Sequence, residues 1–347
     1  MSKKLSQLIF IITTNNGLMR TKEWFIILFL YEKKEDFMKT LIFTHKNDID
    51  GMGNAILAKL AFEETKYVLC GTFDLIKNVN DFIDSKEIYN YDKIFITDLC
   101  LDLKTLNKIE KDTILKNKIQ LIDHHKTYDT DEYKKFSFVK ICLETNKGLS
   151  CATSLFYEYL LENNYLKENK IISEFVELTR QHDTWEWKNI YNNEKSRELA
   201  ILFDCLGTNG YINYMYQKLT TQKEFEFDSV ERMLIENKKE EIKEVLEEYE
   251  KHIFNKEILG YKTSIIFINY EHRNEIADYL KEKGYDTEVI MMISLDRGVV
   301  SYRRTNKNVI VREVAEYFGG KGHDAAATNP ITIEQQEKIL DILTSNN

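Results

Sequence analysis

The chain lacks several features that mark common protein classes. Its five cysteines are odd in number, widely spaced and never arranged as CxxC, which excludes a disulfide framework or a thiolate zinc site and favours a reducing cytoplasm. Its two early apolar runs, residues 8–12 and 24–31, fall short of the roughly 20 residues that span a bilayer, so we expect no membrane association. No basic block stands out among 57 acidic and 48 basic residues, and the net charge is −9. This excludes a surface for long duplex nucleic acid but allows a small anionic substrate.

The length and the apolar pattern predict two domains of the α/β class. From residue 39, short apolar runs alternate with amphipathic stretches, as in a mostly parallel sheet covered by helices. Residues 209–255 are strongly polar and predict a long, charged connecting helix before a second, smaller α/β unit. We therefore expect an N-terminal domain over 38–205, a helical linker over 206–257 and a C-terminal domain over 258–347.

Residues 1–37 stand apart from this pattern. A signal peptide is the alternative, but the first apolar run is short and no small-residue cleavage site follows it. We interpret the segment as an upstream extension of the coding frame, with the functional domain starting near Met38.

Carboxylates and imidazoles gather where the strands of the N-terminal domain should end. The positions are His45, Asp48, Asp50, Asp98, Asp123, His124, His125 and Asp183. Ligands of open parallel sheets lie beyond the carboxyl ends of the strands, and so many charged groups at one edge need compensating cations. Histidine and aspartate without thiolate suit Mn²⁺ or Mg²⁺, and imidazole favours Mn²⁺. Two ions that share a bridging aspartate would activate water for phosphoester or phosphoanhydride hydrolysis.

Each motif also has a simpler interpretation. Asp98 could be a turn or cap residue, Asp48 to Gly51 could be a calcium-like loop, and His182-Asp183 could end a helix. The calcium loop is disfavoured because the other EF-hand ligand positions are missing. Five of the seven histidines, at 45, 124, 125, 182 and 323, fall in these motifs or in a later glycine turn, and this co-occurrence favours the metal site.

The glycine turn GGKGHDAAA begins at Gly319. Glycine lets a backbone approach a phosphate closely, and a helix predicted over HDAAAT would direct its amides at that anion. Arg303, on the preceding predicted strand, could clamp the phosphate through two hydrogen bonds. The alternative is a tight turn that serves helix packing alone.

The ordered motifs resemble the DHH phosphoesterase superfamily with a C-terminal DHHA1 domain. The matches are THKNDIDGMG (44–53), ITD (96–98), DHH (123–125), HDT (182–184) and GGKGHDAAA (319–327), over roughly residues 39–335. In two respects the chain departs from the family: the spacing from His45 to Asp48 differs by one residue from both family patterns, and Lys321 interrupts the glycine run.

The resemblance implies a role for each matched residue. The metal ligands would be His45, Asp48, Asp50, Asp98, His124 and Asp183, with Asp98 as the bridge between two divalent ions, Mn²⁺ before Mg²⁺ or Co²⁺. The catalytic residues would be Asp98, Asp123, His124 and His125. Asp123 would orient the two adjacent histidines, and His125 would either support the metal ligands without binding metal itself or face the phosphate. The substrate-binding residues would be Arg303, Gly319, Gly320, Gly322 and His323.

The two-domain layout and the stretch HDTWEW are most similar to the NrnB-type oligoribonucleases, which are also described as cyclic-nucleotide phosphodiesterases. This implies a phosphodiesterase that releases mononucleotides from short single-stranded RNA. Two alternatives stay open: hydrolysis of 3′-phosphoadenosine 5′-phosphate (pAp) or of a linear or cyclic dinucleotide, and nucleotide sensing without turnover. Trp185 and Trp187 either stack on bases or pack in the core between the domains. A homodimer also stays open.

Overall fold

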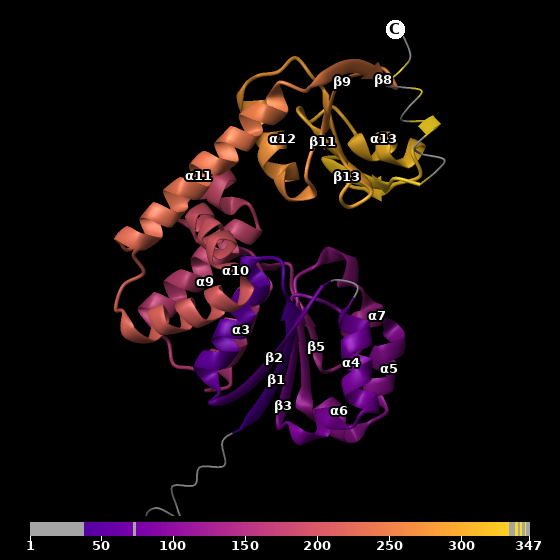
Figure 1. The fold of residues 1–347 in the computed structure, drawn as a ribbon. Coiled ribbons are helices and arrows are strands. Elements are labelled where there is room, and N and C mark those ends of the chain that lie inside the picture. The colour runs from indigo at the N-terminus through magenta and orange to yellow at the C-terminus, as the bar shows by residue number, and fades with distance from the viewer. Residues whose placement is uncertain (1–37, 72–73, 333–336, 339–340, 342–343, 345–347) are drawn as a thin grey trace, which may run out of the picture. The chain divides into compact units, whose positions relative to one another are not determined.

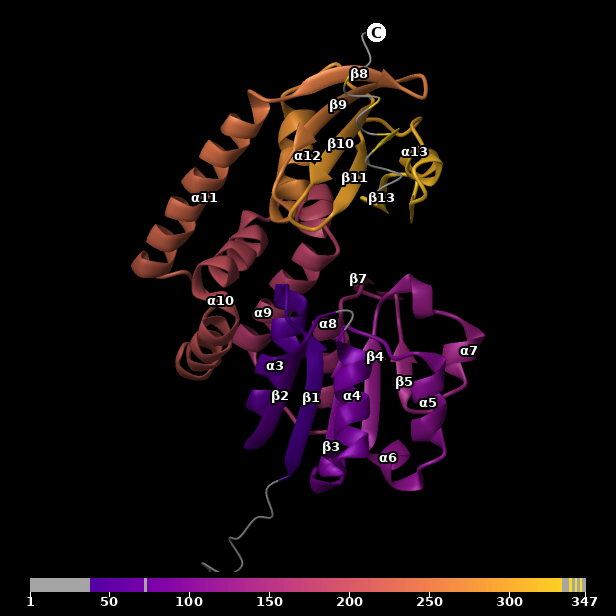
Figure 2. The ribbon, with the colours of Figure 1, turned by 45° about the vertical axis from the view of Figure 1, so that its right-hand side comes forward.

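The structure is a computed structural model that describes residues 38–71, 74–332, 337–338, 341 and 344. The extension predicted over residues 1–37 lies outside the described residues. The chain divides into two compact units, and the boundary falls between Phe227 and Asp228. Each unit contains one main sheet with helices packed on it (Figures 1 and 2). The α/β class, with a parallel sheet in the N-terminal part and a separate C-terminal sheet, is confirmed.

The main sheet of the first unit is parallel throughout. Its strands, in spatial order, are β2 (Glu64–Cys70), β1 (Lys39–His45), β3 (Lys93–Thr97), β4 (Ile119–Asp123) and β5 (Val139–Ile141). Because parallel strands end at the same edge, the residues that follow β1, β3 and β4 meet there. A short hairpin, β6 (Glu144–Thr145) and β7 (Gly148–Leu149), follows β5.

Helices cover both faces of this sheet (Figure 2). They are α3 (Ile49–Ala61), α4 (Leu75–Asp84), α5 (Leu103–Glu110), α6 (Thr113–Lys118), α7 (Asp131–Lys134), α8 (Ala152–Glu162), α9 (Lys170–Asp183) and α10 (Glu194–Thr221). Short 3₁₀ turns lie at Glu87–Asn90 and Lys126–Tyr128, and a π-helical turn spans Trp187–Tyr191.

Side-chain alternation along the strands explains the two layers. Phe43 on β1 meets Phe82 of α4, with ring centroids 5.3 Å apart. Phe95 on β3 meets Phe156 of α8, on the opposite face, with ring centroids 4.9 Å apart. Successive apolar residues of a strand point to opposite faces, so a continuous apolar run becomes a strand buried on both sides.

The second unit is a mixed sheet with helices on both faces. Its strand order is β12 (Lys321–Gly322), β13 (Ala326–Pro330), β11 (Val299–Arg304), β10 (Val289–Ser294), β9 (Tyr261–Phe267) and β8 (Phe254–Ile258). Its helices are α11 (Ser229–Glu250), α12 (Arg273–Glu282) and α13 (Val311–Tyr317), with a 3₁₀ turn at Tyr270–His272. One core includes Met291, Tyr302 and Phe318, and the other includes Ile276 and Met292.

No helix in the described part of the chain is both long and apolar enough to cross a membrane.

Candidate metal centre

The first arm of the candidate centre lies where β1 passes into α3. Asp48 is the N-cap residue of α3, and its Oδ1 accepts a hydrogen bond from the Gly51 amide at 2.9 Å. Its Oδ2 lies 2.6 Å from Nδ1 of His45, the last residue of β1. A Cβ at position 51 would lie 2.0 Å from the His45 carbonyl oxygen, so only glycine lets the helix begin this close to the strand end.

Asp50 is held by the backbone at the start of α8. Its Oδ2 accepts a hydrogen bond from the Ala152 amide at 2.8 Å, and its Oδ1 accepts one from the Thr153 amide at 2.7 Å. The carboxylate is 1% exposed. Backbone amides at a helix N-terminus favour a negative charge, which explains how this acid can be buried.

Asp98 occupies the middle of the site, directly after β3. Its φ of 60° is left-handed, which aspartate adopts more readily than most residues. Its Oδ2 lies 3.7 Å from Nδ1 of His45, and its Oδ1 lies 3.4 Å from Nε2 of His124. The side chain therefore faces an imidazole on each side.

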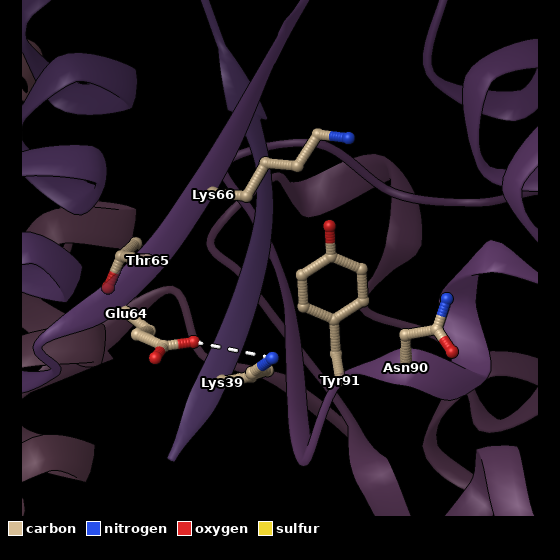
Figure 3. A pocket seen from close by; sticks show the side chains of 6 residues that line it. All are labelled: Lys39, Glu64, Thr65, Lys66, Asn90 and Tyr91. Carbon is tan, nitrogen blue, oxygen red and sulfur yellow. Dashed lines mark ion pairs between the residues drawn. The ribbon is translucent and has the colours of Figure 1, made fainter. Parts of the chain in front are cut away.

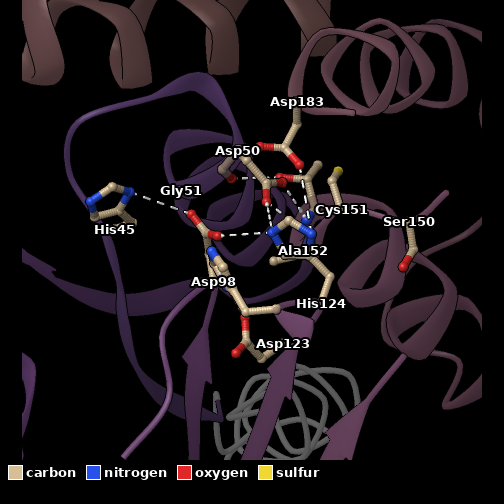
Figure 4. Close-up of polar contacts among 12 residues, drawn as sticks. His45, Asp50, Gly51, Asp98, Asp123, His124, Ser150, Cys151, Ala152 and Asp183 are labelled. Atoms are coloured by element: carbon tan, nitrogen blue, oxygen red, sulfur yellow. Dashed lines mark hydrogen bonds and ion pairs between the residues drawn. The ribbon is translucent and has the colours of Figure 1, made fainter. Parts of the chain in front are cut away.

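His124 and Asp183 complete the second arm. His124 follows β4, and Asp183 is the last residue of α9. The Nε2 of His124 lies 3.6 Å from Asp50 Oδ2, and its Nδ1 lies 3.6 Å from Asp183 Oδ2. Figure 4 shows these groups converging above the strand ends.

The structure brings together all six residues that were predicted as metal ligands. They fall into two groups in which the candidate ligand atoms lie within 4.8 Å of one another: His45, Asp48 and Asp98 form one group, and Asp50, His124 and Asp183 form the other. The contacts of Asp98 with both His45 and His124 link the two groups.

Asp123 and His125 form a third group of this kind with Asp98 and His124. His125 Nδ1 lies 2.7 Å from Oδ1 of the fully buried Asp123, and this hydrogen bond raises the pKa of His125. The predicted orienting contact of Asp123 is thus made to His125, while both ring nitrogens of His124 face other carboxylates. The His125 ring is about half exposed.

The electrostatics of the centre favour a bound cation. Burial raises the pKa of Asp98 well above its ordinary value, and the charges of Asp50 and Asp48 add to this effect. Burial and the same neighbours raise the pKa of Asp183. Burial alone would also raise the pKa of Asp48, but the hydrogen bond with His45 holds it below its ordinary value.

Among the six predicted ligands, two buried atoms have no hydrogen-bond partner, Asp98 Oδ2 and His124 Nε2; Oδ2 of the neighbouring Asp123 has none either. Buried polar atoms are nearly always paired, so these two are suited to coordination. Carboxylate oxygens with imidazole nitrogens and no thiolate fit a hard or borderline divalent cation. The residues present therefore fit a divalent metal centre.

Sequence reasoning missed two supports of this site. The first is the pair of α8 amides that hold Asp50. The polar stretch SCATS before an apolar run indicates the start of a helix, but it does not indicate that this helix start contacts Asp50. The second is Arg180, whose guanidinium is buried and hydrogen-bonds Glu177, Glu186 and the Leu149 carbonyl. It joins α9, which carries Asp183, to the hairpin that leads into α8.

The predicted substrate-binding residues belong to the second unit. Arg303 pairs with Ala326 across β11 and β13, which places it in the sheet next to the hairpin that carries His323. Its guanidinium donates to Asn274 Oδ1 and to the Tyr302 carbonyl, both at 3.0 Å. Burial, together with the neighbouring charge of Arg273, lowers the pKa of Arg303.

The predicted helix over HDAAAT is wrong. His323 and Ala326 close a hairpin by exchanging backbone hydrogen bonds of 2.8 and 3.2 Å, and β13 begins at Ala326. Gly319 and Gly322 have φ of 74° and 155°, and a Cβ at Gly320 would lie 2.2 Å from the Thr328 carbonyl oxygen. The glycines therefore end α13 and form a close hairpin, and strand pairing with β11 replaces the helix that the alanines favour.

A surface pocket of about 340 Å³ lies at the opposite end of β1 (Figure 3). Lys39, Glu64, Lys66 and Tyr91 contribute to its lining. Its two lysines form ion pairs with Glu64 at 3.6 Å and with Glu87 at 2.7 Å. None of the predicted site residues lines it.

No family model matches the chain. It is 31% identical over 301 residues to oligoribonuclease NrnB of Bacillus subtilis (strain 168), and the match covers 86% of this chain and 74% of that protein.

Solved structures that share the fold at low sequence identity include the following three. The DHH domain of PF0399 matches with a TM-score of 0.56 at 13% identity, covering 88% of this chain and 85% of that chain. RecJ of Thermus thermophilus in complex with Mn²⁺ matches with a TM-score of 0.55 at 13% identity, covering 91% of this chain and 53% of that chain. The pGpG-specific phosphodiesterase PggH of Vibrio cholerae matches with a TM-score of 0.53 at 14% identity, covering 88% of this chain and 97% of that chain.

Proposed function

The chain belongs to the DHH phosphoesterase family, within which it is similar to oligoribonuclease NrnB, and we propose that it is a metal-dependent phosphodiesterase that hydrolyses short oligoribonucleotides to mononucleotides. The observation that carries this proposal is the convergence of four carboxylates and two imidazoles into two linked groups at the C-terminal edge of a parallel sheet. Such an arrangement suits in-line displacement at phosphorus. Membership of the family makes the chain a hydrolase of phosphoester bonds.

Two divalent ions would occupy the centre. His45, Asp48 and Asp98 would hold one, and Asp50, His124 and Asp183 would hold the other with Asp98 as the shared ligand. We favour Mn²⁺ over Mg²⁺ and Co²⁺ because two of the ligands are imidazoles. When bound, the ions supply positive charge to the phosphate and lower the pKa of water.

The chain's own residues would position a metal ligand, donate a proton to the leaving oxygen and bind the substrate. The α8 amides keep Asp50 from turning away from the site. Asp123 binds Nδ1 of His125 and raises the pKa of that imidazole, so Nε2 of His125 can donate a proton to the leaving oxygen. In the second unit, Arg303, the glycine turn and His323 would bind a phosphate or the terminal nucleotide of the substrate.

The proposal is tested by a panel of metals and substrates with the purified full chain. We expect Mn²⁺ to support release of mononucleotides from labelled di- to pentaribonucleotides, and EDTA to abolish it. The panel includes pGpG, cyclic di-AMP, pAp and a long RNA, which separate the oligonucleotide proposal from the nucleotide alternatives.

Two variants connect the activity to the centre. Asp98→Asn should abolish hydrolysis. The matched control is Asp102→Asn, which changes an acid that caps α5 outside the two groups and should leave hydrolysis unchanged. If short RNAs stay intact with Mn²⁺ present, the proposed function is wrong. If Asp98→Asn is as active as the unmodified chain, the metal assignment is wrong. If the unmodified chain binds nucleotides but does not hydrolyse them, the protein is a nucleotide sensor.

A further inference from the structure

The two tryptophans of HDTWEW lie in different environments. Trp187 is 7% exposed, and the Arg197 guanidinium carbon lies 6.0 Å from its ring centroid. Trp185 is 38% exposed, and its ring centroid lies 6.2 Å from that of Trp187 at an interplanar angle of 35°. Packing therefore accounts for Trp187, while Trp185 keeps part of its indole open to solvent.

The backbone at Trp185 is in an unusual conformation. Its φ is 60°, in the left-handed region that bulky residues rarely adopt. The turn is nevertheless held firmly, because the Trp185 amide donates to the His182 carbonyl at 3.1 Å and the Trp185 carbonyl accepts from the Asn189 amide at 3.1 Å. A π-helical turn follows at once, and both π turns and strained residues concentrate at functional sites.

Trp185 also lies close to the metal centre along the chain. It follows the candidate ligand Asp183 by two residues, so their Cα atoms are at most about 7 Å apart. Asp98, at the middle of the centre, has the same left-handed φ of 60°. The contacts of Asp98 with two imidazoles account for its strained backbone. Within the part of the chain that the structure describes, the Trp185 indole lies against Trp187 but makes no polar contact that would account for its strained backbone.

We propose that Trp185 is a stacking platform for a nucleobase of the substrate, beside the phosphate that binds at the metal centre. The inference rests on the proposed function and adds the site that receives the base. Every base has a π face, so stacking gives affinity without sequence preference. The hydrogen-bonded turn holds the backbone that carries the indole, and Trp187 packs beside the ring, which lowers the ordering cost of binding.

The test compares a dinucleotide with two analogues that each lack one base. The substrates are 5′-phosphorylated ApA and the same molecule with one adenine replaced by an abasic ribose, prepared in both positions. With Trp185→Ala, we expect KM for ApA to rise about 5- to 150-fold with little change in kcat, and KM for one abasic analogue to stay within about twofold of the unmodified chain. Trp185→Phe should restore most of the affinity. Tyr191→Ala, which removes another exposed aromatic ring from the following turn, is the matched control and should change nothing.

Equilibrium binding of the same dinucleotides, measured by competition against a fluorescent dinucleotide, separates this inference from the proposed function. If the unmodified chain binds but does not hydrolyse, and Trp185→Ala weakens binding of ApA selectively, the proposed function is wrong and the platform is supported. If hydrolysis occurs but Trp185→Ala has no effect, or weakens ApA and both abasic analogues equally, the platform is refuted. An equal loss in Tyr191→Ala would also refute it, because the effect would not be specific to Trp185.

Discussion

Replacing Asp98 with asparagine should stabilise the metal-free protein while it abolishes metal binding. The substitution keeps the size of the side chain, and asparagine tolerates the left-handed φ of 60° that Asp98 adopts. It removes one buried negative charge from a group in which the candidate ligand atoms of Asp48 and Asp98 lie within 4.8 Å. At an effective dielectric constant of ~20, two charges at that distance repel by about 3.5 kcal/mol.

The expected gain in the free energy of unfolding is therefore up to about 3.5 kcal/mol in EDTA. It is smaller to the extent that the raised pKa of Asp98 already keeps part of the population protonated. For a unit of this size, each kcal/mol corresponds to roughly 2–4 °C in Tm. Scanning calorimetry in EDTA should show Asp98→Asn melting above the unmodified chain.

The order of the two Tm values should reverse when Mn²⁺ is added. A ligand at 1,000 times its Kd stabilises the native state by about 4.1 kcal/mol, which exceeds the largest expected gain of Asp98→Asn, and only the unmodified chain keeps the complete ligand set. Asp98→Ala is a useful comparison, because alanine is strained at a left-handed φ and should gain less than asparagine in EDTA. If Asp98→Asn melts below the unmodified chain in EDTA, charge repulsion does not dominate this cluster and the reasoning fails.

Three further predictions concern other parts of the first unit. Trp185→Gly should melt roughly 2–4 °C above Trp185→Ala, because a left-handed φ costs alanine about 1 kcal/mol and glycine almost nothing. If calorimetry shows the opposite order, the turn is not strained. Burial alone would raise the pKa of Glu177, but its hydrogen bonds with Arg180 and Gln181 lower it. This contribution to stability is therefore present above the ordinary glutamate pKa and is lost as the pH falls from there through the lowered pKa of the folded state. Glu177→Gln should therefore flatten the decline in Tm at acid pH, and an unchanged slope would contradict the ion pair. Gly51→Ala should weaken Mn²⁺ binding and hydrolysis and lower the free energy of unfolding by roughly 1–3 kcal/mol, because its Cβ would overlap the His45 carbonyl. The control is Gly210→Ala, whose Cβ would meet only Leu206 Cβ at 3.6 Å. It should change none of these quantities in the same metal titrations, activity assays and melting experiments.

Much of the site could be predicted because parallel strands end at one edge of their sheet. That rule alone brings His45, Asp98 and His124 together, since each follows or ends a strand recognisable from its apolar run. The contribution of α9, which places Asp183, depended on the family motif and not on the strand rule.

Features that depend on contacts distant in the sequence could not be predicted in this way. The hydrogen bonds from the Ala152 and Thr153 amides to Asp50 join residues more than a hundred positions apart. Local sequence patterns do not predict which distant residues come into contact. The left-handed backbone at Asp98 and Trp185 is equally invisible, because neither residue type requires it. The failed helix at HDAAAT shows that pairing with β11 outweighs the helix propensity of three alanines.

The way in which Asp50 is held affects how the chain can change during evolution. Its carboxylate binds main-chain amides, and every amino acid except proline carries that N–H group. Position 152 can therefore drift through most residue types that fit its buried place without loss of the hydrogen bond. A support of this kind leaves little trace in the amino-acid identities of relatives, because only proline at position 152 or 153 would remove one of the two hydrogen bonds.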